Sequence, residues 1–196
     1  YFDTVRLHCP NAKIIFHTVD LHYLREERAA RVKNTSEGLG KANQLKRDEL
    51  EICRKANCTL VPSMSEVSLL QKEVPDAYVE CFPFVQSVPG RKKGFEERKN
   101  IAFVAGYLHE PNVDAITYFA RELWPHIAER LPNAQLLLVG SNMPESVIRL
   151  ASDRIIAVGY VEDLTQFLEN CRVTVAPLRY GAGIKGKIIS SLAHGV

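Results

Sequence analysis

The chain has 196 residues, of which 46% are hydrophobic and 24% charged, and its formal net charge is +2. This composition is typical of a globular chain with one good core, or of one domain together with part of another. The small net charge does not favour nucleic-acid binding, and no run of about 18 apolar residues predicts a membrane-spanning helix.

The N-terminal residues and the cysteines indicate where in the cell the protein is located and whether the given sequence includes its natural N-terminus. No apolar core with a cleavage site stands near the start, so the sequence predicts no secretory signal. The absence of a starting Met indicates that the natural N-terminus lies upstream. The five cysteines are scattered, odd in number and without zinc-site spacing. We therefore expect reduced thiols in a cytoplasmic protein and no metal site.

The first part of the chain alternates short apolar runs with charged helical stretches. We predict strands at 12–20, 57–63 and 77–84, and helices at 21–34, 44–56 and 65–74. The glycines within 35–43 are expected to interrupt the helical pattern, and Ser65 to cap the helix that begins there. Residues 88–99 combine Pro, Gly and charge, which predicts a linker.

The second part of the chain alternates more regularly. We predict strands at 100–106, 134–140, 155–161 and 173–178, and helices at 112–131, 144–152, 163–171 and 185–195. Pro125 is expected to break or kink the first of these helices. Apolar strands alternating with amphipathic helices predict an α/β fold, a Rossmann-like parallel sheet with helices on both faces. Such sheets bind ligands beyond the carboxyl ends of their strands, so we expect a ligand site in the loops that follow these strands.

Two of these loops carry weak signals. Gly106 ends a strand before a helix N-terminus, where a small residue lets a ligand approach the backbone, although by itself the loop is better explained as an ordinary strand-to-helix turn. His109, in the same loop, is a candidate ligand contact or a simple surface residue. In a later loop Asp163 is expected to cap a helix, and Glu162 could accept hydrogen bonds from a nucleoside.

The loop RYGAGIKGK carries a stronger signal. Gly181, Ala182 and Gly183 allow a tight turn with exposed amides, and Lys185 and Lys187 follow in the first helical turn. Lysines at a helix N-terminus oppose the macrodipole, and a bound anion would relieve this. We expect a phosphate-binding turn that is neither a Walker loop nor a dinucleotide fingerprint.

A further cluster lies early in the chain, in the stretch HTVDLHYLR. His17 and Asp20 are candidates for acid–base chemistry or metal binding, with His22 and Arg25 nearby. Strand-end and helix-cap chemistry is the alternative, because Asp is a good N-cap.

Several segments in a fixed order resemble one family. FVAGYLHEPNVDAITYF, AQLLLVG, VGYVEDL and VAPLRYGAGIKGKIISSLAHGV are similar to the C-terminal domain of family 4 (group 1) retaining glycosyltransferases. IIFHTVDLHYLREERAA and RDELEICRKANCTLVPSMSE look like the last part of that family's N-terminal domain. The resemblance implies a remnant of the N-terminal domain at 1–87, a linker at 88–99 and a truncated C-terminal domain at 100–196.

The resemblance also implies a fold and an activity. Family members have the GT-B fold, with two Rossmann-like domains, and transfer a sugar from a nucleotide-sugar donor with retention and without a metal. Such enzymes act on glycan or lipid-linked acceptors, and some contact membranes through the N-terminal domain. By itself, a chain of this extent is expected to be inactive.

Residue roles follow from the same resemblance. Lys185 would neutralise the leaving diphosphate, which Gly106 would let approach, and Glu162 would lie near the base. The further donor-binding candidates are His109, Asn112, Val161, Gly181, Ala182, Gly183, Ile184, Lys187 and Ser190, while His17 and Asp20 remain tentative catalytic candidates.

The sequence departs from the family pattern at several positions. The family commonly has glutamates eight positions apart where Ala182 and Ser190 stand. Tyr107 and Leu108 also replace a basic residue that often follows the first loop. A glycosyltransferase-like binding or regulatory module, or another GT-B enzyme such as a nucleotide-sugar 2-epimerase, therefore stays open beside the transferase. A dinucleotide-dependent dehydrogenase is disfavoured because the glycine fingerprint is missing.

Overall fold

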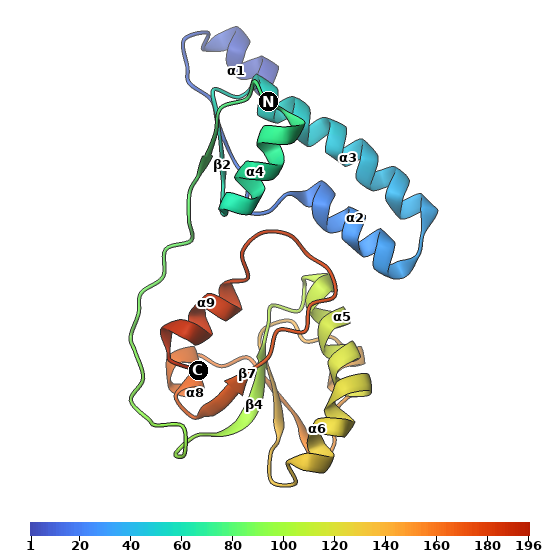
Figure 1. Ribbon diagram of the computed structural model, residues 1–196, viewed down its shortest axis with the longest axis vertical. Coiled ribbons are helices and arrows are strands. Elements are labelled where there is room, and N and C mark those ends of the chain that lie inside the picture. The colour runs from blue at the N-terminus through green and yellow to red at the C-terminus, as the bar shows by residue number, and fades with distance from the viewer. The chain divides into compact units, whose positions relative to one another are not determined.

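The computed structural model describes residues 1–196 and divides into two compact units. The first unit comprises Tyr1–Phe84 and Tyr180–Ile184, and the second comprises Val85–Arg179 and Lys185–Val196. Each unit contains one parallel sheet packed with helices (Figure 1). The predicted α/β class with Rossmann-like parallel sheets is confirmed.

The first unit holds a three-stranded parallel sheet of order β1-β2-β3. Its elements are α1 (Phe2–His8), β1 (Ile15–His17), α2 (His22–Lys33), α3 (Ser36–Lys55), β2 (Cys58–Val61), α4 (Met64–Glu73) and β3 (Val79–Cys81). The buried apolar side chains that hold it together are Leu21, Tyr23, Leu50, Cys53, Val61, Val67, Leu70, Val74 and Val79. All five cysteines of the chain are free thiols.

The helices α2 and α3 are separated by far less than the sequence predicted. Asn34 ends α2 in the left-handed conformation, and the Thr35 Oγ1 atom accepts a hydrogen bond from the Gly38 amide at 3.1 Å to begin α3. Gly38 is therefore helical, and the expected interruption over 35–43 is wrong. A Cβ atom at Gly38 would lie 2.8 Å from the Ala30 Cβ, so this glycine lets the two helices approach closely.

Two predicted helix caps also differ. Ser63, not Ser65, caps α4, because its Oγ accepts a hydrogen bond from the Glu66 amide at 3.3 Å. Asp20 does not cap α2, whose N-cap residue is Leu21. Instead the Glu49 carboxylate, reaching from α3, accepts hydrogen bonds from the His22 amide at 3.1 Å and the Tyr23 amide at 2.8 Å. A buried carboxylate distant in sequence thus satisfies the orphan donors of this helix.

The second unit holds a four-stranded parallel sheet of order β6-β5-β4-β7. Its elements are β4 (Lys99–Val104), α5 (Glu110–Tyr118), the π-helical turn η1 (Phe119–Leu123), α6 (Trp124–Arg130), β5 (Leu136–Val139), α7 (Glu145–Ile148), β6 (Ile155–Gly159), α8 (Leu164–Leu168), β7 (Cys171–Thr174) and α9 (Gly186–Ala193). In Figure 1, α5 and α6 lie on one side of β4 and β7, and α8 and α9 on the other.

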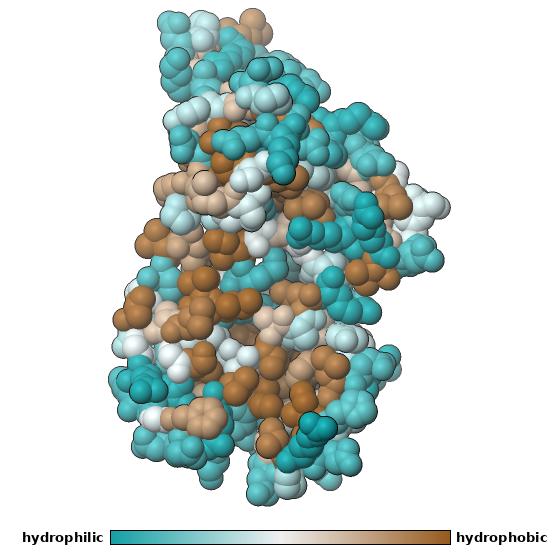
Figure 2. Space-filling view, in the orientation of Figure 1, coloured by the Kyte–Doolittle hydropathy of each residue, from teal (hydrophilic) through white to brown (hydrophobic).

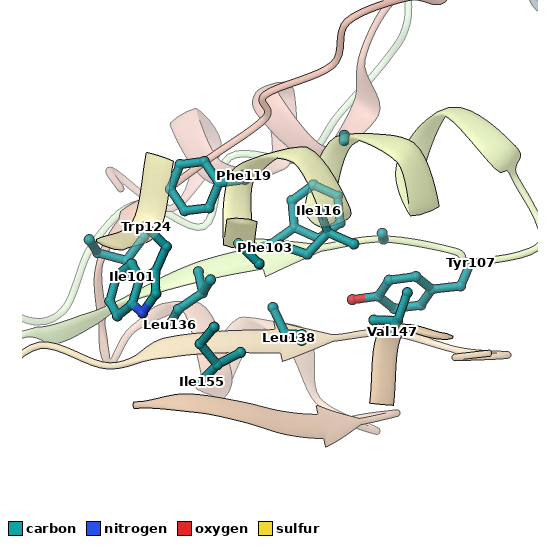
Figure 3. Close-up of a cluster of buried hydrophobic side chains, with 13 residues drawn as sticks. Ile101, Phe103, Tyr107, Ile116, Phe119, Trp124, Leu136, Leu138, Val147 and Ile155 are labelled. Carbon is teal, nitrogen blue, oxygen red and sulfur yellow. The ribbon is translucent and has the colours of Figure 1, made fainter. Parts of the chain in front are cut away.

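The core of the second unit lies between β4, β5 and the helical stretch from α5 to α6 (Figure 3). Phe103 and Leu138 from the strands are fully buried, and Ile116, Phe119 and Trp124 from the helical stretch cover them. The π-helical turn lies directly before Pro125, whose missing N–H cannot continue the helical ladder. The predicted irregularity at Pro125 is therefore confirmed.

The helical surface of the first unit is strongly polar. Figure 2 shows mainly hydrophilic side chains over α2 and α3, in keeping with ion pairs such as Arg31–Glu27 and Lys41–Glu37. No helix of the chain has the length and apolar character needed to span a bilayer.

Candidate functional site

The strand order of the second unit defines where a ligand is expected. From β4 the chain moves through β5 to β6 on one side and then returns to place β7 on the other side of β4. This is a topological switch point, and ligands of open α/β sheets bind beyond the carboxyl ends of the strands there. The loop after β4 contains Gly106, and the segment after β7 leads to Lys185 and α9.

Gly106 has open space above its backbone. A Cβ atom built at this position would meet no other atom within 4 Å, and Gly106 is absent from the residues with positive φ. Neither backbone strain nor packing therefore requires glycine here. The space is what a ligand that approaches the backbone would need.

Two further residues predicted to bind the same ligand, Asn112 and Lys187, meet beside this glycine. The Lys187 Nζ atom donates a hydrogen bond to the Asn112 Oδ1 atom at 2.7 Å. The Asn112 Nδ2 atom donates in turn to the Gly106 carbonyl at 2.8 Å. The Lys187 ammonium also lies 4.4 Å from the centroid of the buried Phe103 ring, within cation–π range. The structure thus joins the loop after β4, the first turn of α5 and the first turn of α9.

The electrostatics of this group favour an anion. Burial, together with the positive charge of Lys185, lowers the pKa of Lys187 to about 8. Lys185 is the N-cap residue of α9, and Lys187 lies in its first turn, where the helix dipole is positive. Lys187 forms no ion pair with a carboxylate, so a bound anion would neutralise its charge at the helix N-terminus.

A cavity of about 280 Å³ is lined by the ends of β4 and β7 and by α9, and Lys187 is part of its lining. Apart from Lys187 it is lined mainly by apolar side chains, including Val104, Val175, Ile188 and Leu192. Such a lining does not suit an anion, so the charged end of a ligand belongs on the Gly106 side.

The glycine loop itself belongs to the first unit. The Gly181 carbonyl accepts a hydrogen bond from Arg28 at 2.6 Å, and the Gly183 amide donates to the Glu66 Oε1 atom at 3.1 Å. Gly183 has a φ of +67, and a Cβ there would lie 2.8 Å from the Asp20 Cβ and 2.8 Å from the Val19 carbonyl oxygen. Only glycine fits this position.

The early cluster is held by structural contacts. Arg25 donates to both carboxylate oxygens of Asp20, at 2.8 and 3.2 Å, and the His22 Nε2 atom lies 3.2 Å from Asp20. His17 is exposed and meets the Phe82 ring edge-on, with ring centroids 5.4 Å apart. No group of three or more His, Cys, Asp or Glu residues is arranged to hold a metal ion.

The remaining candidates lie in the loop after β6, at the start of α5 and in the middle of α9. Val161 and Glu162 line an open hollow with Asp163, which caps α8 as predicted by accepting from the Gln166 amide at 3.0 Å. His109 is the N-cap residue of α5, without a side-chain cap bond. The Ser190 Oγ atom lies 3.5 Å from the Gln86 Oε1 atom.

The structure adds residues that the sequence did not single out. Glu66 is 4% exposed, and its two oxygens bind the Ser63 hydroxyl and the Gly183 amide. The Ser-x-x-Glu spacing signals a capping box, but nothing local signals the second contact. Arg179 donates to both carboxylate oxygens of Asp114, which ties the end of the β7 segment to α5.

Comparison with known proteins adds family information. The sequence profile described as "Glycosyl transferases group 1" matches residues 98–196. No curated protein matches the chain by sequence.

Solved structures share the fold. Sucrose-phosphate synthase from Thermosynechococcus elongatus has a TM-score of 0.66 at 18% identity, over 93% of this chain and 48% of its own. TarM from S. aureus, in complex with fondaparinux, alpha-GlcNAc-glycerol and UDP, has a TM-score of 0.63 at 12% identity, over 76% of this chain and 31% of its own.

The pneumococcal O-GlcNAc transferase GtfA, in complex with UDP and GlcNAc, has a TM-score of 0.60 at 15% identity, over 78% of this chain and 31% of its own. The chain thus spans less than half the length of each of these proteins.

Proposed function

Since the chain belongs to the group 1 glycosyl transferases, we propose that it is part of a family 4 enzyme that transfers a sugar from a nucleotide-sugar donor to an acceptor with retention. The observation that carries the proposal is the Gly106–Asn112–Lys187 group at the switch point of the second sheet. It combines open space above a backbone, uncompensated positive charge and the N-terminus of α9.

The chemistry assigned to this group is stabilisation of the leaving nucleoside diphosphate. As the bond between the anomeric carbon and the diphosphate breaks, negative charge grows on the diphosphate oxygens. Lys185, Lys187 and the free amides of α9 are fixed donors that oppose this charge without reorganisation. We propose that these groups neutralise the diphosphate without a metal.

The other parts of the donor are assigned by resemblance. Val161 and Glu162 would lie near the base, and Ser190 near the ribose. Binding of the donor sugar by Gly181–Ile184 would require a change at Gly183. The Gly183 amide already donates to Glu66, so a sugar or phosphate oxygen that binds this amide has to displace that carboxylate.

We propose UDP-linked sugars as the first donors to test, because TarM and GtfA were solved with UDP. The same two structures contain GlcNAc or a GlcNAc glycoside, which supports a glycan acceptor. A lipid-linked compound is the alternative acceptor. We also propose that the full-length protein is cytoplasmic and contacts a membrane peripherally through its N-terminal domain.

The experiment is to incubate the full-length protein with a panel of UDP- and GDP-sugars and candidate acceptors. We expect consumption of one donor and, by NMR of the product, an unchanged anomeric configuration. Lys187→Met should lower donor turnover about 30-fold or more, as expected for loss of about 2 kcal/mol of charged contact. Lys99→Met, an exposed lysine at the start of β4, is the matched control and should retain full activity. Absence of turnover with every donor would contradict the proposal.

A second candidate function is a binding or regulatory module. Ala182 and Ser190 favour it, because neither can replace a carboxylate that holds a sugar or a ribose. Nucleotide binding that depends on Lys185 but gives no turnover would identify this module. A nucleotide-sugar 2-epimerase would instead change the donor sugar in the absence of any acceptor.

A further inference from the structure

Asn112 forms a bridge whose direction is fixed by chemistry. Asn112 is a buried residue, with 7% of its surface exposed to solvent. The Gly106 carbonyl can only accept a hydrogen bond, and the Lys187 ammonium can only donate one. The Asn112 amide group must therefore face Gly106, and its oxygen must face Lys187. No other neutral side chain of this length supplies one donor and one acceptor in this geometry.

Because Asn112 is neutral, the same bridge leaves the positive charge of Lys187 uncancelled. An Asp at position 112 would have nearly the same shape, but its carboxylate would form an ion pair with Lys187 and cancel the positive charge. The amide oxygen of Asn112 holds the ammonium at 2.7 Å without cancelling it. The groups that face Lys187 are Asn112 from α5, the Phe103 ring from β4 and the like charge of Lys185. None of these is an anion.

We infer that Asn112 is a positioning residue that orients the Lys187 ammonium and leaves its charge available for the diphosphate of the donor. The inference rests on the proposed function and revises one expectation, since it places Asn112 behind the lysine rather than against the ligand. It also gives a reason for Asn at this position in the first turn of α5, where an Asp would otherwise favour the helix dipole.

The charge state of Lys187 gives the inference a signature in pH. With its pKa lowered to about 8, Lys187 loses its proton as the pH rises through this value. Binding of an anion by the wild-type protein should therefore weaken from about pH 7.5 upward. In Asn112→Asp the new carboxylate raises the pKa of Lys187, so the weakening should move to higher pH, while affinity below about pH 7.5 falls because the lysine charge is cancelled.

The experiment uses the full-length protein with UDP and inorganic pyrophosphate as probes. Titration of Lys187 is followed by NMR without ligand, and affinity by calorimetry between pH 6.5 and 9.5. Asn112→Asp should raise the pKa of Lys187 and weaken UDP binding at least ten-fold. Asn133→Asp adds the same charge at an exposed position before β5 and should change neither. In the Lys187→Met background, Asn112→Leu, which removes the bridge without adding a charge, should change UDP affinity less than three-fold.

The outcomes separate this inference from the proposed function. An unchanged pKa of Lys187 in Asn112→Asp overturns the inference, and so does a ten-fold loss of UDP affinity when Asn112→Leu is added to the Lys187→Met background. A raised pKa of Lys187, in a protein that binds neither UDP nor pyrophosphate, supports the positioning role and overturns the proposed function.

Discussion

Replacing Gly106 with Val separates folding from ligand binding. Because a Cβ at Gly106 meets nothing within 4 Å and the backbone is not in the positive-φ region, a side chain can begin there without a clash or backbone strain. The free energy of unfolding should change by no more than about 0.5 kcal/mol, as for other surface substitutions. If the diphosphate binds as proposed, the same side chain fills the space through which it would reach the backbone. Loss of one hydrogen bond to a charged group costs about 1.5–3 kcal/mol, which is roughly a 10- to 150-fold weaker Kd.

The assay is calorimetric titration of UDP, with urea unfolding of the same samples. Gly40→Val is the matched control, because Gly40 in α3 also has no atom within 4 Å of a built Cβ. We expect Gly106→Val to unfold at the wild-type urea concentration and to bind UDP at least ten-fold more weakly, and Gly40→Val to bind normally. Wild-type affinity in Gly106→Val would refute the reasoning that the ligand approaches this backbone. A large loss of stability in Gly106→Val would contradict the observation that the space next to Gly106 is open.

Three further predictions concern the first unit. Glu49→Ala leaves two amides at the start of α2 without acceptors, so urea unfolding should show a loss of about 2–4 kcal/mol, whereas a change below 0.5 kcal/mol would show that the cap is dispensable. Burial raises the pKa of Tyr23 to about 12. Between pH 10 and 12 the tyrosine therefore ionises in the unfolded chain but not in the folded one, and the free energy of unfolding falls by about 3 kcal/mol over this range. In Tyr23→Phe the free energy of unfolding should therefore no longer fall between pH 10 and 12. At pH 7 the substitution should cost nothing, because the buried hydroxyl has no hydrogen-bond partner. A variant with the same pH dependence as the wild type would contradict the role of Tyr23. Gly183→Ala should lower stability by at least about 1–2 kcal/mol because of its positive φ, and an unshifted urea midpoint would contradict the strain.

The features that the sequence predicts well are set by local chemistry. Pro125 disturbs the helix around it because its ring removes a donor, whatever the tertiary surroundings. Asp163 caps α8 because the acceptor and the amide lie three residues apart. The parallel sheets follow from apolar runs that alternate with amphipathic helices.

The features that it misses depend on residues distant in sequence. Glu49 replaces Asp20 as the acceptor at the start of α2, from 27 residues away, because the packing of α3 against α2 brings it there. Lys187 and Asn112 are 75 residues apart, and only the strand order places them in contact. Residue types predicted an anion site near Lys185, but the bridge that orients Lys187 could not be read from spacing.

The central claim is that the second unit carries the donor site, with Lys185 and Lys187 as its cations. The most direct measurement is calorimetric titration of the full-length protein with UDP and GDP, comparing the wild type with the Lys185→Ala/Lys187→Met double variant and with Lys99→Ala. We predict that the wild type binds at least one of the two nucleotides and that Lys99→Ala stays within two-fold of it. The double variant should bind at least about 30-fold more weakly, since two charged contacts are lost. Equal affinity of the double variant and the wild type, or no binding of either nucleotide by the wild type, would contradict the account.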